Sequence, residues 1–134
     1  MAHYGCTYKQ AIELLQNKKP DINGTRKHRI AHETYLVKYD GIDAFYVEYH
    51  KASVVILHKN GKLDIAHCGY RTRTTKVRIN EFLSATNAGC YVYQQKGNWY
   101  VTKRSGIEPN NKTQDLLFGS SIRVCPKSGK IIQR

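Results

Sequence analysis

SVVILHKNGKLDIA, residues 53–66, carries the strongest structural signal in the chain. It opens with a run of β-branched and other apolar residues, continues through the pair Asn60-Gly61, and closes with a second short apolar segment. Asn-Gly strongly favours the left-handed backbone of a tight hairpin turn. The stretch therefore predicts two antiparallel strands joined by a turn, and with them an antiparallel sheet.

Similar short segments on both sides of this hairpin extend the sheet. They are rich in β-branched and aromatic residues, and turn-forming pairs such as Asp40-Gly41 and Gly97-Asn98 separate them. We expect these further strands at residues 34–39, 45–50, 91–95, 99–103, 122–125 and 130–133.

Two segments have helical periodicity instead. Thr7 and Gln10 have the spacing of a capping box, and the apolar residues that follow fall on one side of a helix over residues 7–17. Thr74 or Thr75 can cap a second helix, which ends near Ser84 and buries Ile79, Phe82 and Leu83.

These elements predict an α+β fold, in which two helices pack against a curved antiparallel sheet of about six to eight short strands. The length of 134 residues is typical of a single domain, here residues 1–134. Pro20, Asn23-Gly24 and several cations predict an exposed basic connection at about residues 18–30.

Positive charge dominates the composition. The 22 Lys and Arg residues outnumber the 10 Asp and Glu residues, which gives a net charge of +12 and a pI near 9.7. Such an excess attracts polyanions whatever the fold. The cations gather in three acid-poor stretches, Lys18–Arg29, Arg71–Arg78 and Arg123–Arg134, which favours a binding surface over charge that only maintains solubility.

Composition also argues against several other classes. No apolar run reaches the roughly 18 residues of a membrane-spanning helix, and residues 1–10 lack the apolar segment of a secretory signal. The four cysteines are single and lack zinc-ligand spacing, so we expect neither a metal nor a cofactor. We expect a protein that stays in the cytoplasm where it is made and makes no membrane contact. A homo-oligomer is left open.

A basic, hydroxyl-rich segment, GYRTRTTKVRIN at residues 69–80, lies where the second helix is expected to begin. The first turn of a helix presents unpaired N–H groups and a positive dipole end, so hydroxyls and cations there suit a phosphate. The alternative is that the threonines only cap the helix and the cations are solvated. The predicted ligand- and phosphate-binding residues are Tyr70, Arg71, Thr72, Arg73, Thr74, Lys76, Arg78 and Asn80.

Aromatic residues lie beside several of these cations. The chain has 10 tyrosines and three phenylalanines, and a tyrosine ring can stack on a base while its hydroxyl stays wet. Tyr70 beside Arg71 is one such grouping. A second consists of Tyr91, Tyr93, Trp99 and Tyr100 near Lys96 and Lys103.

Two histidines are the candidates for catalysis, if the protein is an enzyme. His32-Glu33-Thr34 and His50-Lys51-Ala52-Ser53 loosely resemble the His-x-Thr/Ser pairs of two-histidine phosphoesterases. Ala52 stands where the second hydroxyl should be. No Ser-His-Asp or paired-carboxylate arrangement stands out.

Part of the chain also resembles a family of small uncharacterised proteins from tailed bacteriophages, over roughly residues 26–104. The matching segments are HETYL at 32–36, VEYH at 47–50 and the run GYRTRTTKVRIN, whose family pattern is Gly-[Trp/Tyr]-x-Thr-x-Thr-Thr-Lys-x-Arg-Ile-Asn. The chain departs from the residues usual in the family at His32, Ala52, Ser53 and Cys68, and at Tyr70, where tryptophan is the usual residue. The resemblance implies a phage accessory protein, made in the cytoplasm of an infected bacterial host, and implies no particular reaction.

Four functions are compatible with these features. The first is a binder of an anionic nucleotide ligand, which would sequester a nucleotide signal of host defence. The second, nearly equal to it, is a nucleic-acid-binding accessory protein for DNA or RNA. The third is a His-dependent phosphodiesterase that degrades a nucleotide signal or cleaves nucleic acid. The fourth is a minor virion or interaction protein whose charge is incidental.

Overall fold

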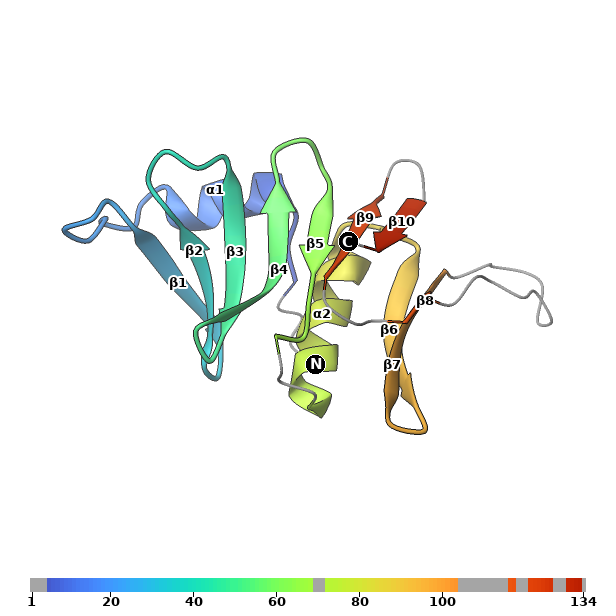
Figure 1. Cartoon of the computed structure of the whole chain (residues 1–134). Coiled ribbons are helices and arrows are strands. Elements are labelled where there is room, and N and C mark those ends of the chain that lie inside the picture. The colour runs from blue at the N-terminus through green and yellow to red at the C-terminus, as the bar shows by residue number, and fades with distance from the viewer. Residues whose placement is uncertain (1–4, 69–71, 104–115, 118–120, 127–129, 134) are drawn as a thin grey trace.

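Seven antiparallel strands form the main sheet of the protein, which a computed structural model describes over residues 5–68, 72–103, 116–117, 121–126 and 130–133. Figure 1 shows the first four strands side by side as a meander. The order across the sheet is β1 (Arg26–Ala31), β2 (Thr34–Lys38), β3 (Ala44–Tyr49), β4 (Ala52–His58), β5 (Leu63–Ile65), β9 (Ile122–Cys125) and β10 (Lys130–Gln133).

The hairpin predicted over residues 53–66 is confirmed as β4 and β5. Val55 pairs with Ile65, and Leu57 pairs with Leu63. Gly61 has a φ of +91°, a backbone conformation that costs glycine little because it has no Cβ. The sequence could not show that β9 would then pair with the free edge of β5, which places Asp64 opposite Arg123.

Both predicted helices are present, and they lie on the same face of the main sheet (Figure 1). Helix α1 (Tyr8–Leu15) begins with the expected capping box of Thr7 and Gln10, and it ends two residues earlier than predicted. Helix α2 (Arg73–Ala85) is capped by Thr72 rather than by Thr74 or Thr75. Its buried side consists of Thr75, Ile79, Phe82 and Leu83.

Alternate residues of the main sheet face these helices and form the core. Leu36, Val47, Val55 and Ile65 are fully buried on four successive strands, as the two-residue period of a strand requires. Val124 of β9 belongs to the same cluster. The residues between them therefore point to the opposite face of the sheet.

A second sheet packs against the other side of α2. It consists of β6 (Cys90–Gln95), β7 (Asn98–Lys103) and β8 (Leu116–Leu117), and the predicted hairpin over 91–103 is confirmed. Trp99 is 1% exposed and joins the core cluster together with Val92 and Val101. One hydrophobic core therefore connects both sheets through α2.

The α+β class and the curved antiparallel sheet with two helices are confirmed. One detail needs correction. Arg26–Ala31 forms strand β1, so the exposed connection predicted over residues 18–30 does not extend past residue 25. The main sheet has seven strands, within the predicted six to eight, and β6, β7 and β8 form a separate second sheet. β1 was missed because an edge strand needs little apolar character, and its cations resemble those of a connection.

Candidate functional site

The first turn of α2, which was predicted to bind phosphate, is built around its capping residue. The Thr72 hydroxyl accepts a hydrogen bond from the Thr75 backbone N–H at 3.2 Å and lies 3.1 Å from the Thr75 hydroxyl. Thr72 and Arg73 are exposed, while Thr74 is half-buried. Tyr70 and Arg71 lie outside the described residues. Thr72 therefore has the capping role that the alternative interpretation assigned to the threonines.

Lys76 and Asn80, further along α2, hold the helix to the second sheet. The Lys76 ammonium donates to the Gln94 side chain at 2.9 Å and lies 5.5 Å from the centre of the Trp99 ring. The Asn80 amide donates to the Val92 carbonyl at 3.0 Å and accepts from the Val92 N–H at 2.7 Å. Both side chains thus have partners within the protein.

Arg78 faces the main sheet instead. Its Nε donates to the Thr34 hydroxyl at 3.2 Å, and its guanidinium lies 3.8 Å from the Glu81 carboxylate. Its side chain is only 11% exposed. The predicted site residues therefore do not converge: Arg73 remains at the surface, while the side chains of Lys76, Arg78 and Asn80 point to three different internal partners.

The two candidate catalytic histidines lie in neighbouring turns at one end of the main sheet. His32 lies between β1 and β2 and His50 between β3 and β4, and the His50 N–H donates to the Glu33 carbonyl at 3.0 Å. The His50 imidazole is 3.7 Å from the Glu33 carboxylate and is 40% exposed. Glu33, His50 and Lys51 all have positive φ, so both turns contain non-glycine residues in the left-handed region. A catalytic role for His50 and His32 stays a prediction.

The predicted aromatic grouping of the second sheet is divided by the fold. Trp99 is buried in the core, whereas Tyr93 and Tyr100 are half-buried and stack on each other with ring centres 5.4 Å apart. Tyr91 lies 5.8 Å from Tyr93. Tyr93 and Tyr100 therefore already stack on each other, and Tyr91 contacts Tyr93 at a tilted angle.

A different surface combines aromatic rings with cations. It is the face of the main sheet turned away from α1 and α2, and we call it the open face (Figure 1). Tyr35 on β2 is 38% exposed. In the strand register it lies opposite Arg29 of β1 on one side and opposite Glu48 of β3 on the other. Tyr39 and Tyr46 lie beside it, with ring centres 5.2 Å apart.

Lys27 and Arg29 give the edge of the open face its positive charge. Both belong to β1, the outermost strand, and both are exposed. Within the described residues, the ion pairs between an arginine or lysine and a carboxylate are those of Arg78 and Arg123. The charges of Lys27 and Arg29 are therefore available to an anionic partner.

The carboxylates of the open face, by contrast, are held by neighbours. The Tyr39 hydroxyl donates a hydrogen bond to Glu48, and this bond is the main cause that raises the pKa of Tyr39 to about 12. Burial adds to the same effect. Tyr39 thus remains a neutral phenol and a donor to Glu48 throughout the physiological range.

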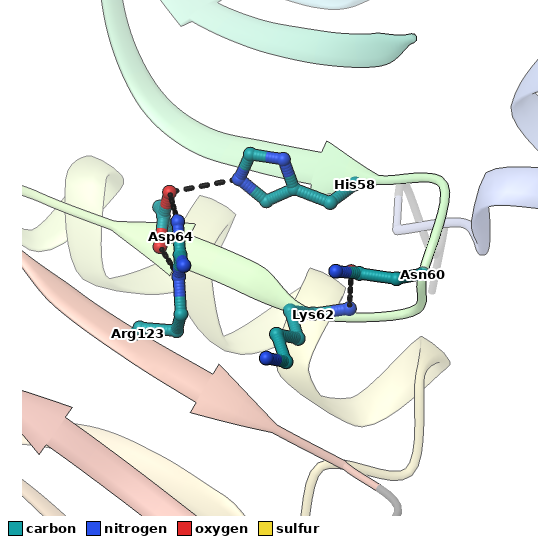
Figure 2. A network of polar contacts seen from close by, with 5 residues as sticks. All are labelled: His58, Asn60, Lys62, Asp64 and Arg123. Atoms are coloured by element: carbon teal, nitrogen blue, oxygen red, sulfur yellow. Dashed lines mark hydrogen bonds and ion pairs between the residues drawn. The ribbon is translucent and has the colours of Figure 1, made fainter.

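Asp64 is the most buried of these carboxylates and has two cationic or hydrogen-bonding partners (Figure 2). Arg123 binds it in bidentate fashion, with Nε 2.8 Å from Oδ1 and a terminal nitrogen 3.1 Å from Oδ2. The His58 Nε2 lies 2.8 Å from Oδ2. Burial raises the pKa of Asp64, but the bonds with Arg123 and His58 outweigh it and lower the pKa to about 2. The charge of Asp64 is compensated within the sheet.

A cavity of about 340 Å³ opens at the end of the open face, near the β1–β2 turn with Glu33 and the β3–β4 turn with His50 and Lys51. Its lining residues are Lys27, Glu33, Tyr35, Glu48 and Lys51. A second cavity of about 260 Å³ lies near the β4–β5 turn and has a mainly apolar lining that includes Tyr8, Leu57 and Leu63. The first combines an aromatic ring with side chains of both charges. A third cavity of about 300 Å³, near Arg26, Tyr39 and Asp40, shares this combination but does not include Tyr35.

The sequence contained a partial signal for the open face. Lys27 and Arg29 belong to the acid-poor stretch noted above, but Tyr35 was not singled out, because the strand status of residues 26–31 was missed. Once residues 26–31 are known to form a strand, its two-residue period places Lys27 and Arg29 on the same face. Tyr35 lies on that face too, because it is directly opposite Arg29 on β2.

The described residues were compared with the requirements of a metal site and of a membrane-spanning helix. Among them, no group of three or more His, Cys, Asp or Glu side chains is arranged to hold a metal ion. No helix among them is both long enough and apolar enough to span a membrane.

Comparisons with known proteins identify the family. A family model described as Kyanoviridae Gp96 protein matches residues 10–123, which is most of the chain. No curated protein and no solved structure matches it. The match confirms the resemblance to a phage protein family and leaves the motif at residues 69–80 a prediction.

Proposed function

Because the chain belongs to the Kyanoviridae Gp96 family of bacteriophage proteins, we propose that it is a phage accessory protein that binds nucleic acid through the open face of its main sheet. It would act in the cytoplasm of the infected host, where phage and host nucleic acids are both present. The family match supports the phage origin, and the surface supports the choice of partner.

One observation carries this proposal: the exposed cations of β1 lie next to a tyrosine ring on the sheet face opposite α1 and α2, the two helices of the described residues. Lysine and arginine bind the phosphate backbone by releasing counterions, and exposed rings bind bases by stacking. Pairing of Asp64 with Arg123 reduces the repulsion that this carboxylate would exert on a polyanion.

The arrangement of the cations favours a polymer over a small nucleotide. A nucleotide-sequestering site needs several donors that converge on one phosphate group. The side chains of Lys76, Arg78 and Asn80 instead contact different parts of the protein. Lys27, Arg29 and Lys51 are exposed on an edge strand and a neighbouring turn, and separate cations of this kind suit a partner that carries many phosphates.

The test compares two double variants that lose the same charge. Lys27→Ala/Arg29→Ala removes the cations of the open face, and Lys9→Ala/Lys59→Ala removes exposed cations from α1 and the β4–β5 turn. Binding of a fluorescein-labelled single-stranded oligonucleotide is followed by anisotropy over a series of salt concentrations.

We expect the Lys27/Arg29 variant to bind more weakly and to lose about 0.7 from the slope of log affinity against log salt for each phosphate contact removed. The Lys9/Lys59 variant should retain most of the affinity. Equal losses in both variants, or wild-type affinity that does not change with salt, would contradict the proposal.

A further inference from the structure

We propose that the cavity of the open face binds one unstacked guanine base of a single-stranded nucleic acid. This inference rests on the proposed function and adds the class of substrate to it. The base would stack on Tyr35, donate hydrogen bonds to the carboxylates that line the cavity, and leave its neighbouring phosphates beside Lys27 and Lys51.

The cavity has the size of a site for part of a ligand. Its volume of about 340 Å³ lies at the lower end of the roughly 300–1,000 Å³ that small-molecule sites occupy. It therefore suits a single base better than a whole dinucleotide. Bases become available to such a cavity in single strands, where they can leave the stack, and not in an intact duplex.

Tyr35 supplies the stacking surface. It is one of the exposed large hydrophobic side chains of the described residues, and it lies on β2 between Arg29 and Glu48. Stacking of a base on an aromatic side chain contributes to affinity and does not depend strongly on which base it is. Tyr35 would therefore contribute affinity for any base, and the preference for guanine must come from polar groups that line the cavity.

Glu33 and Glu48 supply those polar groups. A carboxylate only accepts hydrogen bonds, so it selects a base edge that carries adjacent donors. Guanine has two such donors side by side, the ring N1–H and the 2-amino group. Adenine, cytosine and thymine do not present an adjacent pair of donors. Hydrogen bonds to a charged acceptor are about twice as strong as neutral ones, so the preference should be measurable.

Glu33 is the better placed of the two carboxylates to contact a base. Its side chain is 51% exposed, and its turn is fixed by the bond from the His50 N–H to the Glu33 carbonyl. Glu48 is half-buried and already accepts the Tyr39 hydroxyl. Lys27 and Lys51 are exposed and can balance the two negative charges when a phosphate backbone approaches.

The experiment measures anisotropy of short oligothymidines that carry one central guanine, hypoxanthine, adenine or cytosine. Hypoxanthine retains the N1–H of guanine and lacks only its 2-amino group. We expect the guanine oligonucleotide to bind about tenfold more tightly than plain oligothymidine, with hypoxanthine in between. Free guanosine monophosphate should compete only weakly, because it lacks the flanking phosphates.

Three variants identify the groups responsible. Glu33→Gln should remove the guanine preference and retain salt-dependent binding of oligothymidine, while Glu13→Gln on the exposed surface of α1 should change neither. Tyr35→Ala should weaken binding of every oligonucleotide, and Tyr35→Phe should restore it. Thermal unfolding of each variant shows whether it is folded.

The outcomes separate this inference from the proposed function. Wild-type protein that binds all the oligonucleotides equally, or a guanine preference that survives Glu33→Gln, would overturn the inference and leave nucleic-acid binding intact. Failure to bind any oligonucleotide would overturn both. Strong competition by guanosine monophosphate would show that the cavity takes a free nucleotide, and would also overturn the single-strand assignment.

Discussion

Replacing Asp64 with Asn removes the charge at the centre of the network in Figure 2 and keeps the shape of the side chain. The carboxylate is 11% exposed, while the side chains of Arg123 and His58 are 29% and 28% exposed, so solvent screens these bonds in part. Burial raises the pKa of Asp64, but those bonds lower it overall from 3.8 to about 2. That difference corresponds to about 2 kcal/mol of folding free energy.

The direction of the pKa shift of Asp64 determines at which pH its contribution to stability can be measured. A carboxylate whose pKa is lowered by folding stabilises the protein fully above its ordinary pKa of 3.8, and this contribution is lost as the pH falls through about 2. Urea unfolding at about pH 7 should therefore show Asp64→Asn to be less stable than the wild type by about 2 kcal/mol. The difference should shrink as the pH approaches 2.

Asp43→Asn is the matched control, because Asp43 is exposed. It should change the free energy of unfolding by no more than about 0.5 kcal/mol. The reasoning would be refuted if Asp64→Asn cost no more than Asp43→Asn, or if its cost were the same at acidic and neutral pH.

Three further predictions concern α2 and the core. Asn80→Ala should destabilise the protein by about 1–3 kcal/mol in urea unfolding, because it removes both bonds to the Val92 backbone. Its affinity for an oligonucleotide should be unchanged, and a large loss of affinity in the folded variant would contradict a purely structural role. Thr72→Ala should cost about 1 kcal/mol through loss of the α2 cap, and Thr72→Ser should recover most of it in the same assay. Cys6 should resist alkylation in the folded protein near neutral pH, since burial raises its pKa to about 11; rapid labelling in peptide mass spectrometry would contradict its placement.

Much of the fold could be predicted from local signals. The Asn60-Gly61 turn and the Thr7/Gln10 capping box each depend on residues close in sequence, and both are present in the structure. The cap of α2 was misplaced by a few residues because Thr72, Thr74 and Thr75 are chemically equivalent candidates. Only the backbone conformation of Thr72, which is extended, distinguishes it.

Long-range pairing was the part that the sequence could not show. Asp64 and Arg123 are separated by 59 positions and meet only because β9 pairs with β5. Nothing local marks Asp64 as the partner of Arg123 rather than as a solvated acid. The same holds for Asn80, whose two bonds to Val92 depend on how α2 packs against β6.

The candidate site shows both the strength and the limit of charge as a signal. The net charge directs attention to the cations, but it does not indicate which of them are exposed and which have partners within the protein. Arg78 and Lys76, chosen from a helix face, bond to side chains of neighbouring elements. Lys27 and Arg29 lie exposed on an edge strand, where Arg29 donates to the nearby Ala31 carbonyl. Whether a cation is exposed depends on how its side chain packs, and only the structure shows this packing.

The most direct test of the account is to map the nucleic-acid contact on the protein itself. Backbone amide shifts in nuclear magnetic resonance spectra would be followed while unlabelled single-stranded oligonucleotide is added. We predict that the largest changes fall on β1, β2 and the turn that contains Lys51, around Lys27, Arg29 and Tyr35. Changes confined to the first turn of α2, or to the second sheet, would contradict the assignment of the open face as the binding surface.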